Sequence, residues 1–132
     1  MNMVHEITQK KILMVEDDVF ISDVIIQALK REGFNVIYAS KGSDVLPLVK
    51  EEHPDLILLD LALPDMDGLD VLTDIRKEKV LRLIPVIVYS NNAGAENREM
   101  AKMKGAVGFI EKSKYMPSEV VAEVKKILRE NE

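Results

Sequence analysis

The sequence contains no cysteine and no tryptophan, and its two histidines are His5 and His53. The absence of cysteine excludes disulfide bonds, thiol catalysis and cysteine-ligated zinc sites, and two histidines alone cannot form a multi-histidine metal site. The longest uncharged stretch, residues 83–95, is too short to cross a membrane. Residues 1–10 lack the apolar region of a secretion signal. We therefore expect a cytoplasmic protein with no membrane insertion.

Basic residues are outnumbered by acidic ones, 18 to 23, which gives a net charge of −5. A direct nucleic-acid binder needs a basic surface, so this balance favours protein partners instead. A length of 132 residues predicts a single domain. We place this domain at residues 10–132 and expect residues 1–9 to form a flexible N-terminal tail.

Short apolar runs alternate with amphipathic segments along the chain. Strands are predicted at residues 12–15, 34–39, 56–59, 85–89 and 107–110. Helices are predicted at residues 20–29, 42–51, 69–77, 95–104 and 118–129. Strands without polar alternation, separated by helices, indicate an α/β fold with a doubly wound, five-stranded parallel sheet and five helices.

Two helices of this pattern are weak. Pro47 lies in the second helix, where it is tolerated only near the first turn. The fourth helix is poor in large aliphatic residues. We expect its Met100 and Met103 to cover the edge of the core, the alternative being an adaptable contact surface.

In an open α/β sheet, ligands bind at the carboxyl ends of the strands. The residues at these ends are Glu16, Asp17 and Asp18 after the first strand, Asp60 after the third, Ser90 and Asn91 after the fourth, and Lys112 after the fifth. An aspartate at this place can also serve only to cap the following helix, which is the alternative role for Asp18.

The charges at this edge do not balance. Glu16, Asp17 and Asp60 carry −3 and Lys112 carries +1, which leaves −2. One divalent cation would neutralise this excess, and oxygen-only ligands favour Mg²⁺ or Mn²⁺ over zinc. A carboxylate beside such a cation can act as a nucleophile toward phosphorus. The Lys112 ammonium and the Ser90 hydroxyl could then bind the oxygens of the transferred group.

Four segments carry a resemblance to a known family: ILMVEDD at residues 12–18, DLILLDLALPDMDGLDVL at 55–72, PVIVYS at 85–90 and GAVGFIEK at 105–112. Together the segments make residues 10–129 resemble the receiver (CheY-like) domains of two-component response regulators. The resemblance implies a flavodoxin-like, CheY-like sheet with strand order 2-1-3-4-5.

The resemblance also implies roles for individual residues. Asp60 would be the phosphoacceptor, and Lys112 would pair with the phosphoryl group. Asp17 and Asp60 would ligate Mg²⁺ directly, as would the backbone carbonyl of Ala62, while Glu16 would act through water. Ser90 would be the switch hydroxyl and Phe109 the switch aromatic.

A resembling protein would take its phosphoryl group from a phosphohistidine of a sensor histidine kinase or histidine phosphotransfer protein. It would be no enzyme in the ordinary sense, although it would assist its own phosphorylation and dephosphorylation. Its output would reach a protein target through the face formed by the fourth helix, fifth strand and fifth helix. We expect a monomer or a weak, phosphorylation-linked dimer.

Three positions depart from the family pattern. Asn91 stands where a small residue usually follows the switch hydroxyl. Ser113 stands where a proline usually follows the lysine across a cis bond, and a cis bond before serine would cost about 3 kcal/mol. We therefore expect a trans bond there or an altered loop that holds Lys112 less firmly. Pro47 is the third departure.

The leading interpretation is a stand-alone receiver, and the main alternative is a receiver cut from a larger hybrid kinase or regulator. A phosphatase with an aspartate nucleophile would need a second aspartate two residues later, where this chain has Ala62, and a cap insertion, which it lacks. A receiver-like interaction module that is never phosphorylated is a further alternative, left open by Asn91 and Ser113.

Overall fold

The computed structural model describes residues 9–91 and 94–131. The predictions for residues 1–8 lie outside the described residues. The strands are β1 (Lys11–Val15), β2 (Asn35–Ala39), β3 (Leu56–Leu59), β4 (Val86–Ser90) and β5 (Gly108–Glu111). The α-helices are α2 (Val19–Arg31), α3 (Val45–Glu52), α4 (Gly68–Lys77), α5 (Ala95–Met103) and α6 (Pro117–Glu130), and η1 (Gly42–Asp44) and η2 (Lys112–Lys114) are 3₁₀ turns.

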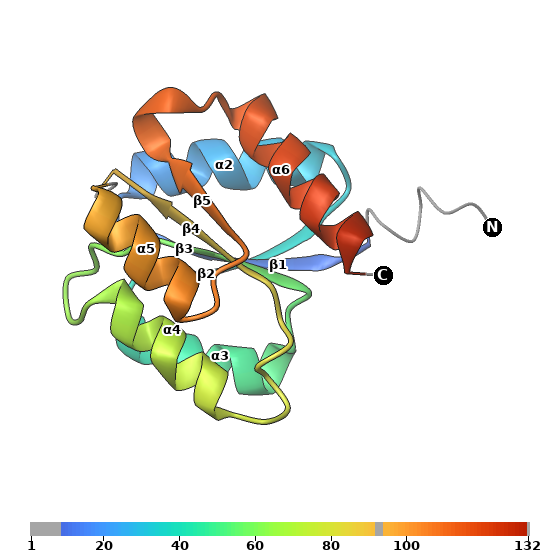
Figure 1. Cartoon of the computed structure of the whole chain (residues 1–132). Helices are drawn as coiled ribbons and strands as arrows, with labels where there is room; N and C mark the ends of the chain where they lie inside the picture. The colour runs from blue at the N-terminus through green and yellow to red at the C-terminus, as the bar shows by residue number, and fades with distance from the viewer. Residues whose placement is uncertain (1–8, 92–93, 132) are drawn as a thin grey trace.

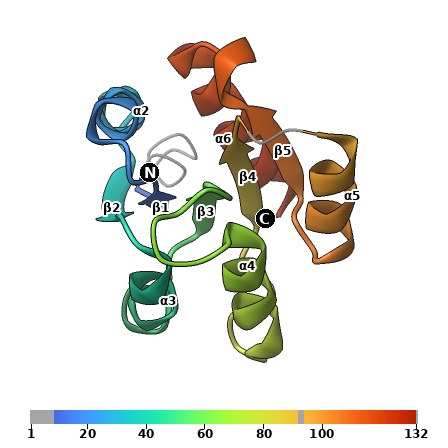
Figure 2. The ribbon, with the colours of Figure 1, turned by 90° about the vertical axis from the view of Figure 1, so that its left-hand side faces the viewer.

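The five strands form one parallel sheet in the order β2-β1-β3-β4-β5. Figure 2 shows this order across the sheet, with helices on both sides. The predicted doubly wound α/β fold with five parallel strands and five helices is confirmed for the part of the chain that the structure describes.

Helices cover both faces of the sheet (Figure 1). On β1, Ile12 and Met14 pack with α2 and α6, whereas Leu13 and Val15 pack with α3 and α4 on the other side. The fifth α-helix, α5, contributes Ala101 to a smaller apolar cluster near β4 and β5. Because β1, β3 and β4 are buried on both sides, their sequences are mostly apolar rather than alternating, whereas the edge strand β2 has exposed Asn35 and Tyr38.

The chain leaves each strand at the same edge and enters a helix there. Asp18 begins α2, and its Oδ1 accepts hydrogen bonds from the backbone N–H groups of Phe20 (3.0 Å) and Ile21 (3.1 Å). Such a cap satisfies N–H groups that have no partner inside the helix. The capping role is therefore the one that Asp18 performs.

Three details of the sequence prediction need correction. The second α-helix, α3, begins at Val45 rather than at residue 42, because the 3₁₀ turn η1 precedes it. Pro47 is thus its third residue and lies in the first turn, where a proline is tolerated as expected. N–H groups there lack intrahelical partners, so the proline removes no hydrogen bond. Ser90 is the last residue of β4 rather than the first after it. Met103 is 74% exposed and Met100 is half-exposed, so they do not cover the core edge as expected.

Candidate functional site

The hydrogen bonds of the sheet continue past the ends of β1 and β3 and bring two carboxylates together. The N–H of Glu16 donates to Ala39 O (3.0 Å), and the N–H of Asp60 donates to Val15 O (3.1 Å). One carboxylate oxygen from each of Glu16, Asp17 and Asp60 lies within 4.8 Å of the other two. The structure thus assembles the three acidic residues that the sequence places at this edge.

Burial differs among these carboxylates. Glu16 and Asp60 are buried, while Asp17 is exposed. Burial raises the pKa of Glu16, because a carboxylate loses its hydration there, and the negative charge of Asp60 raises it further. Hydrogen bonds from Lys112 and from the N–H of Asp18 act in the opposite direction without reversing the shift.

Lys112 supplies the positive charge of the cluster. Its Nζ donates to Asp60 Oδ2 (2.9 Å) and forms an ion pair with Glu16 Oε1. The ring of Tyr89 lies 5.4 Å from the same Nζ, a cation–π distance. Burial acts to lower the pKa of Lys112, but the bonds to Glu16 and Asp60 outweigh it and raise the pKa.

The cluster suits a hard divalent cation. Three carboxylates face one ammonium, and all candidate ligand atoms are oxygens. Within the described residues, Glu16 Oε1 is buried without a hydrogen bond of good geometry, although it lies in the ion pair with Lys112. Glu16, Asp17 and Asp60 are therefore the residues that could hold Mg²⁺ or Mn²⁺.

The remaining predicted residues lie around this cluster. The N–H of Ala62 donates to Asp60 Oδ1 (3.2 Å). Ser90 is buried at the end of β4, next to the strand that precedes Asp60. Phe109 is half-buried, and the guanidinium of Arg98 lies 4.7 Å from the centre of its ring. The structure thus brings Ala62 and Ser90 close to the acidic cluster, while Phe109 packs beneath α5.

The two unusual positions, Asn91 and Ser113, are bonded to each other. The peptide bond before Ser113 is trans, in agreement with the prediction, as are all others in the described segments. The N–H of Ser113 donates to Asn91 Oδ1 over 2.9 Å. Two carboxylates hold Lys112, so the structure shows the trans bond and not the alternative, a loop that holds the lysine less firmly.

Sequence reasoning assigned no role at this edge to three residues that shape it. The hydroxyl of Tyr38 on β2 donates to the backbone oxygen of Glu16 (2.6 Å). Asp65 accepts from the N–H groups of Ser43 (2.9 Å) and Gly42 (2.8 Å), and these bonds lower the pKa of Asp65. A Cβ on Gly68 would lie 2.3 Å from Asp60 O, so only glycine fits there. The first two contacts join segments about 22 residues apart and leave no local sequence signal.

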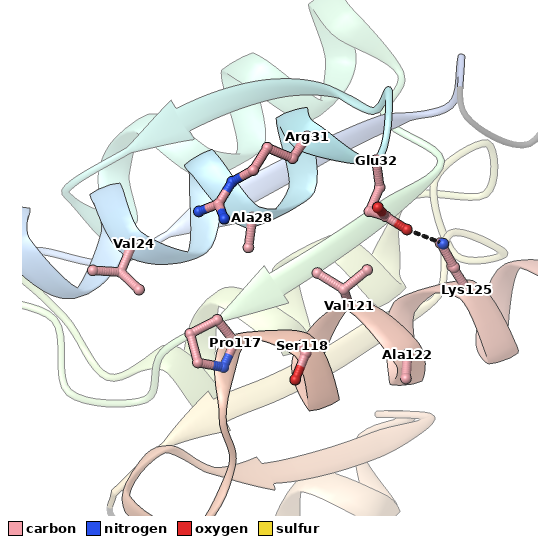
Figure 3. A pocket seen from close by; sticks show the side chains of 9 residues that line it. All are labelled: Val24, Ala28, Arg31, Glu32, Pro117, Ser118, Val121, Ala122 and Lys125. Carbon is pink, nitrogen blue, oxygen red and sulfur yellow. Dashed lines mark hydrogen bonds and ion pairs between the residues drawn. The ribbon is translucent and has the colours of Figure 1, made fainter.

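A groove of about 460 Å³ lies elsewhere, between α2 and α6 (Figure 3). Val24 and Ala28 line it from α2, and Val121 lines it from α6. An ion pair between Glu32 and Lys125 crosses one end. None of the clustered carboxylates lines this groove, so it is no part of the candidate metal site.

Comparison with known proteins identifies the family. The model of the response regulator receiver domain matches residues 12–125. A relative is the alkaline phosphatase synthesis transcriptional regulatory protein PhoP of Bacillus subtilis (strain 168), 36% identical over 93% of this chain and 50% of its own length. The chain therefore belongs to the response regulator receiver domain family.

Solved structures agree with this assignment. A CheY-like receiver domain protein from Methanospirillum hungatei JF-1 has a TM-score of 0.87 and 31% identity, covering 93% of this chain and 96% of its own. The phosphorylated cyanobacterial phytochrome response regulator RcpA has a TM-score of 0.77 and 31% identity, covering 90% and 91%. The chain spans about half the length of the curated relatives it matches.

Proposed function

We propose that Asp60 accepts a phosphoryl group from a phosphohistidine of a sensor histidine kinase or histidine phosphotransfer protein. An Asp60 oxygen forms the new P–O bond while the P–N bond to the imidazole breaks, and the imidazole leaves with the electron pair. The observation that carries the proposal is the buried Asp60 carboxylate, bonded to Lys112 and adjacent to two further carboxylates.

The residues around Asp60 have complementary tasks. Lys112 Nζ, 2.9 Å from Asp60 Oδ2, balances negative charge there before transfer and on the phosphoryl oxygens afterwards. The buried hydroxyl of Ser90 is the switch donor to those oxygens. Glu16, Asp17, Asp60 and the carbonyl of Ala62 are the proposed Mg²⁺ ligands, Glu16 through water. Bound Mg²⁺, or Mn²⁺ in its place, would neutralise charge on the reacting oxygens.

Phosphorylation adds about −1.5 to −2 charge at Asp60. Ser90 and Phe109 are the proposed two-state element that this charge biases, and the output surface is the face of α5, β5 and α6. Phe109 is suited to such a role because it is half-buried between the small cluster of Leu61, Val88 and Ala101 and the guanidinium of Arg98. The partner there would be a protein, and self-association would be weak and phosphorylation-linked.

One observation supports the phosphoacceptor proposal, and another bears on the proposed location in the cytoplasm. RcpA, whose fold matches this chain, is described in its phosphorylated form. No helix in the described segments is long and apolar enough to cross a membrane. We propose a cytoplasmic single-domain regulator. The alternative is a receiver within a larger regulator, and the curated relatives are about twice as long as this chain.

The test is the intact mass of the protein after incubation with Mg²⁺ and acetyl phosphate. Wild type should gain one phosphoryl group, and both Asp60→Asn and a chelator should abolish the gain. Asp55→Asn is the matched control, because Asp55 lies at the opposite edge of the sheet and should leave the gain intact. No adduct together with no Mg²⁺ binding would refute the proposal and favour a phosphorylation-independent interaction module.

A further inference from the structure

A side chain extends the β4–β5 ladder beyond its last backbone pair. The register ends with Ser90 opposite Glu111. One residue beyond Ser90, Asn91 Oδ1 accepts a hydrogen bond of 2.9 Å from the N–H of Ser113. Ser113 lies two residues beyond Glu111, directly after Lys112. The bond therefore joins the residue that follows Ser90 to the residue that follows Lys112.

Lys112 needs an accurately placed backbone. Lys112 directly follows β5, which is separated from β3 by β4, so the distance to the end of β3 is about two strand spacings, or ~10 Å. The Lys112 side chain must cross the end of β4 to bring Nζ within 2.9 Å of Asp60 Oδ2. The ring of Tyr89 on β4 lies near this Nζ. A small shift of the Lys112 backbone would therefore change the position of Nζ relative to Asp60 Oδ2.

The chain diverges just beyond the last rung of the ladder. The helix that follows β4 is α5, and after Glu111 the chain enters the 3₁₀ turn η2. Among the hydrogen bonds that the structure describes between the two departing segments is the one from Ser113 to Asn91. This hydrogen bond links the two segments directly beside Lys112.

We infer that Asn91 is a positioning residue, which holds Lys112 in place relative to Asp60 by accepting the hydrogen bond from the Ser113 N–H. This inference rests on the proposed function, since the ammonium that it places is the one proposed to bind the phosphoryl group. It assigns to Asn91 a role in the rate of phosphoryl acceptance without contact to the reacting atoms. Ser113 contributes to this arrangement through its backbone N–H. Its hydroxyl donates instead to Glu111 Oε2 (3.4 Å).

Two substitutions break the bond from opposite sides. Asn91→Ala removes the acceptor, and Ser113→Pro removes the donor, since proline has no N–H. Ser113→Ala is the matched control, because it deletes the hydroxyl and keeps the N–H. The measured quantity is the rate of phosphoryl gain from acetyl phosphate with Mg²⁺, followed by intact mass in wild type, the three variants and the double variant Asn91→Ala/Ser113→Pro.

We expect Asn91→Ala to slow acceptance by about three- to tenfold, the range of one hydrogen bond. Ser113→Pro should slow it equally where the bond before the proline stays trans, which the NMR shifts of the proline ring report. The double variant should be no slower than the slower single variant, because both remove the same bond. Ser113→Ala should stay within about twofold of wild type. Additive losses, or a loss in Ser113→Ala equal to that in Ser113→Pro, would overturn the inference.

A second readout works without phosphorylation and separates the two proposals. The NMR signals of the Lys112 side chain should shift in Asn91→Ala and stay in place in Ser113→Ala. Unchanged Lys112 signals in Asn91→Ala would overturn the inference even if that variant were slow. If wild type gains no phosphoryl group, the proposed function fails, and the Lys112 signals alone decide whether Asn91 positions the lysine. Since Asn91→Ala changes an exposed side chain, misfolding of Ser113→Pro would leave both readouts usable.

Discussion

The same sheet carries a lysine with carboxylates at each of its two edges, and the two groups differ in burial. At the amino edge, Lys11 Nζ pairs with Glu52 Oε1 at 2.9 Å, and their side chains are 33% and 31% exposed. At the carboxyl edge, the side chains of Lys112, Glu16 and Asp60 are 10%, 1% and 3% exposed. The same residue types are thus partly exposed to solvent at the amino edge and buried at the carboxyl edge.

This difference separates a structural contact from a site for chemistry. Water can screen the charges of the Lys11 pair, so the pair contributes little to folding. The carboxyl-edge cluster has little such screening, and its three carboxylates exceed its one ammonium. A buried excess of negative charge is unfavourable by itself and attracts a cation. The comparison teaches that burial and charge imbalance, rather than residue type, mark the reactive edge.

The largest expected effect comes from removing each lysine in turn. Lys112→Ala leaves Glu16 and Asp60 buried without their cation, and we expect a loss of about 3–5 kcal/mol in the free energy of unfolding. Lys11→Ala removes a partly exposed pair and should cost about 0–1 kcal/mol. Urea unfolding at pH 7 with chelator, followed by circular dichroism, measures both.

Mg²⁺ should recover part of the loss in Lys112→Ala, because the cation can replace the missing positive charge. It should leave the Lys11→Ala loss unchanged. Equal destabilisation by the two substitutions would contradict the distinction between the edges.

Cation binding gives the next largest effect. At a Mg²⁺ concentration of 100 times its dissociation constant, wild type should gain about 2.7 kcal/mol of stability. Asp17→Asn removes the exposed carboxylate of the cluster and should reduce this gain at the same Mg²⁺ concentration. Thermal unfolding with and without Mg²⁺ provides the measurement. Asp55→Asn, at the amino edge, should retain the full gain, and a loss there would argue against a site at the carboxyl edge.

Backbone crowding at the carboxyl edge gives a smaller effect. Gly68→Ala would place a Cβ 2.3 Å from Asp60 O and 2.6 Å from Leu61 Cα, and neither backbone atom can move freely. We expect a loss of about 1–3 kcal/mol, measured by urea unfolding. Gly94→Ala is the control, because nothing lies within 4 Å of its added Cβ, and it should stay within about 0.5 kcal/mol. Similar losses in both variants would show that the crowding has no energetic consequence.

The pH dependence of stability gives the smallest effect. The pKa of Glu16 is raised above its ordinary value of 4.5, so folded protein holds this proton more tightly than unfolded protein. In the presence of chelator, the contribution of Glu16 to the free energy of unfolding should therefore fall as the pH rises from 4.5 through the raised pKa. Glu16→Gln should remove this fall. Urea unfolding from pH 4 to pH 8 measures it, and a profile unchanged by Glu16→Gln would contradict the assignment to this residue.

Much of the fold could be predicted because its signals are local. The continuous apolar runs at Leu56–Leu59 and Pro85–Tyr89 predict strands buried on both faces, and the bounds of β3 and β4 match these runs within one residue. Pro47 lies in the first turn, where we expect it to be tolerated, but the first residue of that helix could not be predicted because η1 sets it. The exposure of Met103 depends on how α5 lies against β5, which no periodicity records.

The site divides in the same way. Glu16, Asp17, Asp60 and Lys112 could be placed at one edge because parallel strands end at the same edge of a sheet. Their assembly into one cluster is confirmed, while their roles in phosphoryl transfer stay predictions. The contacts of Lys112 with the Tyr89 ring and of Ser113 with Asn91 could not be predicted. Each depends on side-chain directions that arise only after β4 and β5 have paired.

The sequence by itself determined the order of strands and helices and the set of charged residues at the carboxyl edge. Both follow from patterns that neighbouring residues carry along the chain. Tertiary structure alone decided which charges are buried, which remain in water, and which backbone groups hold the lysine. Burial and hydrogen bonding join residues far apart in sequence, such as Lys112 and Asp60, 52 positions apart, and only the packed sheet brings them within reach of each other.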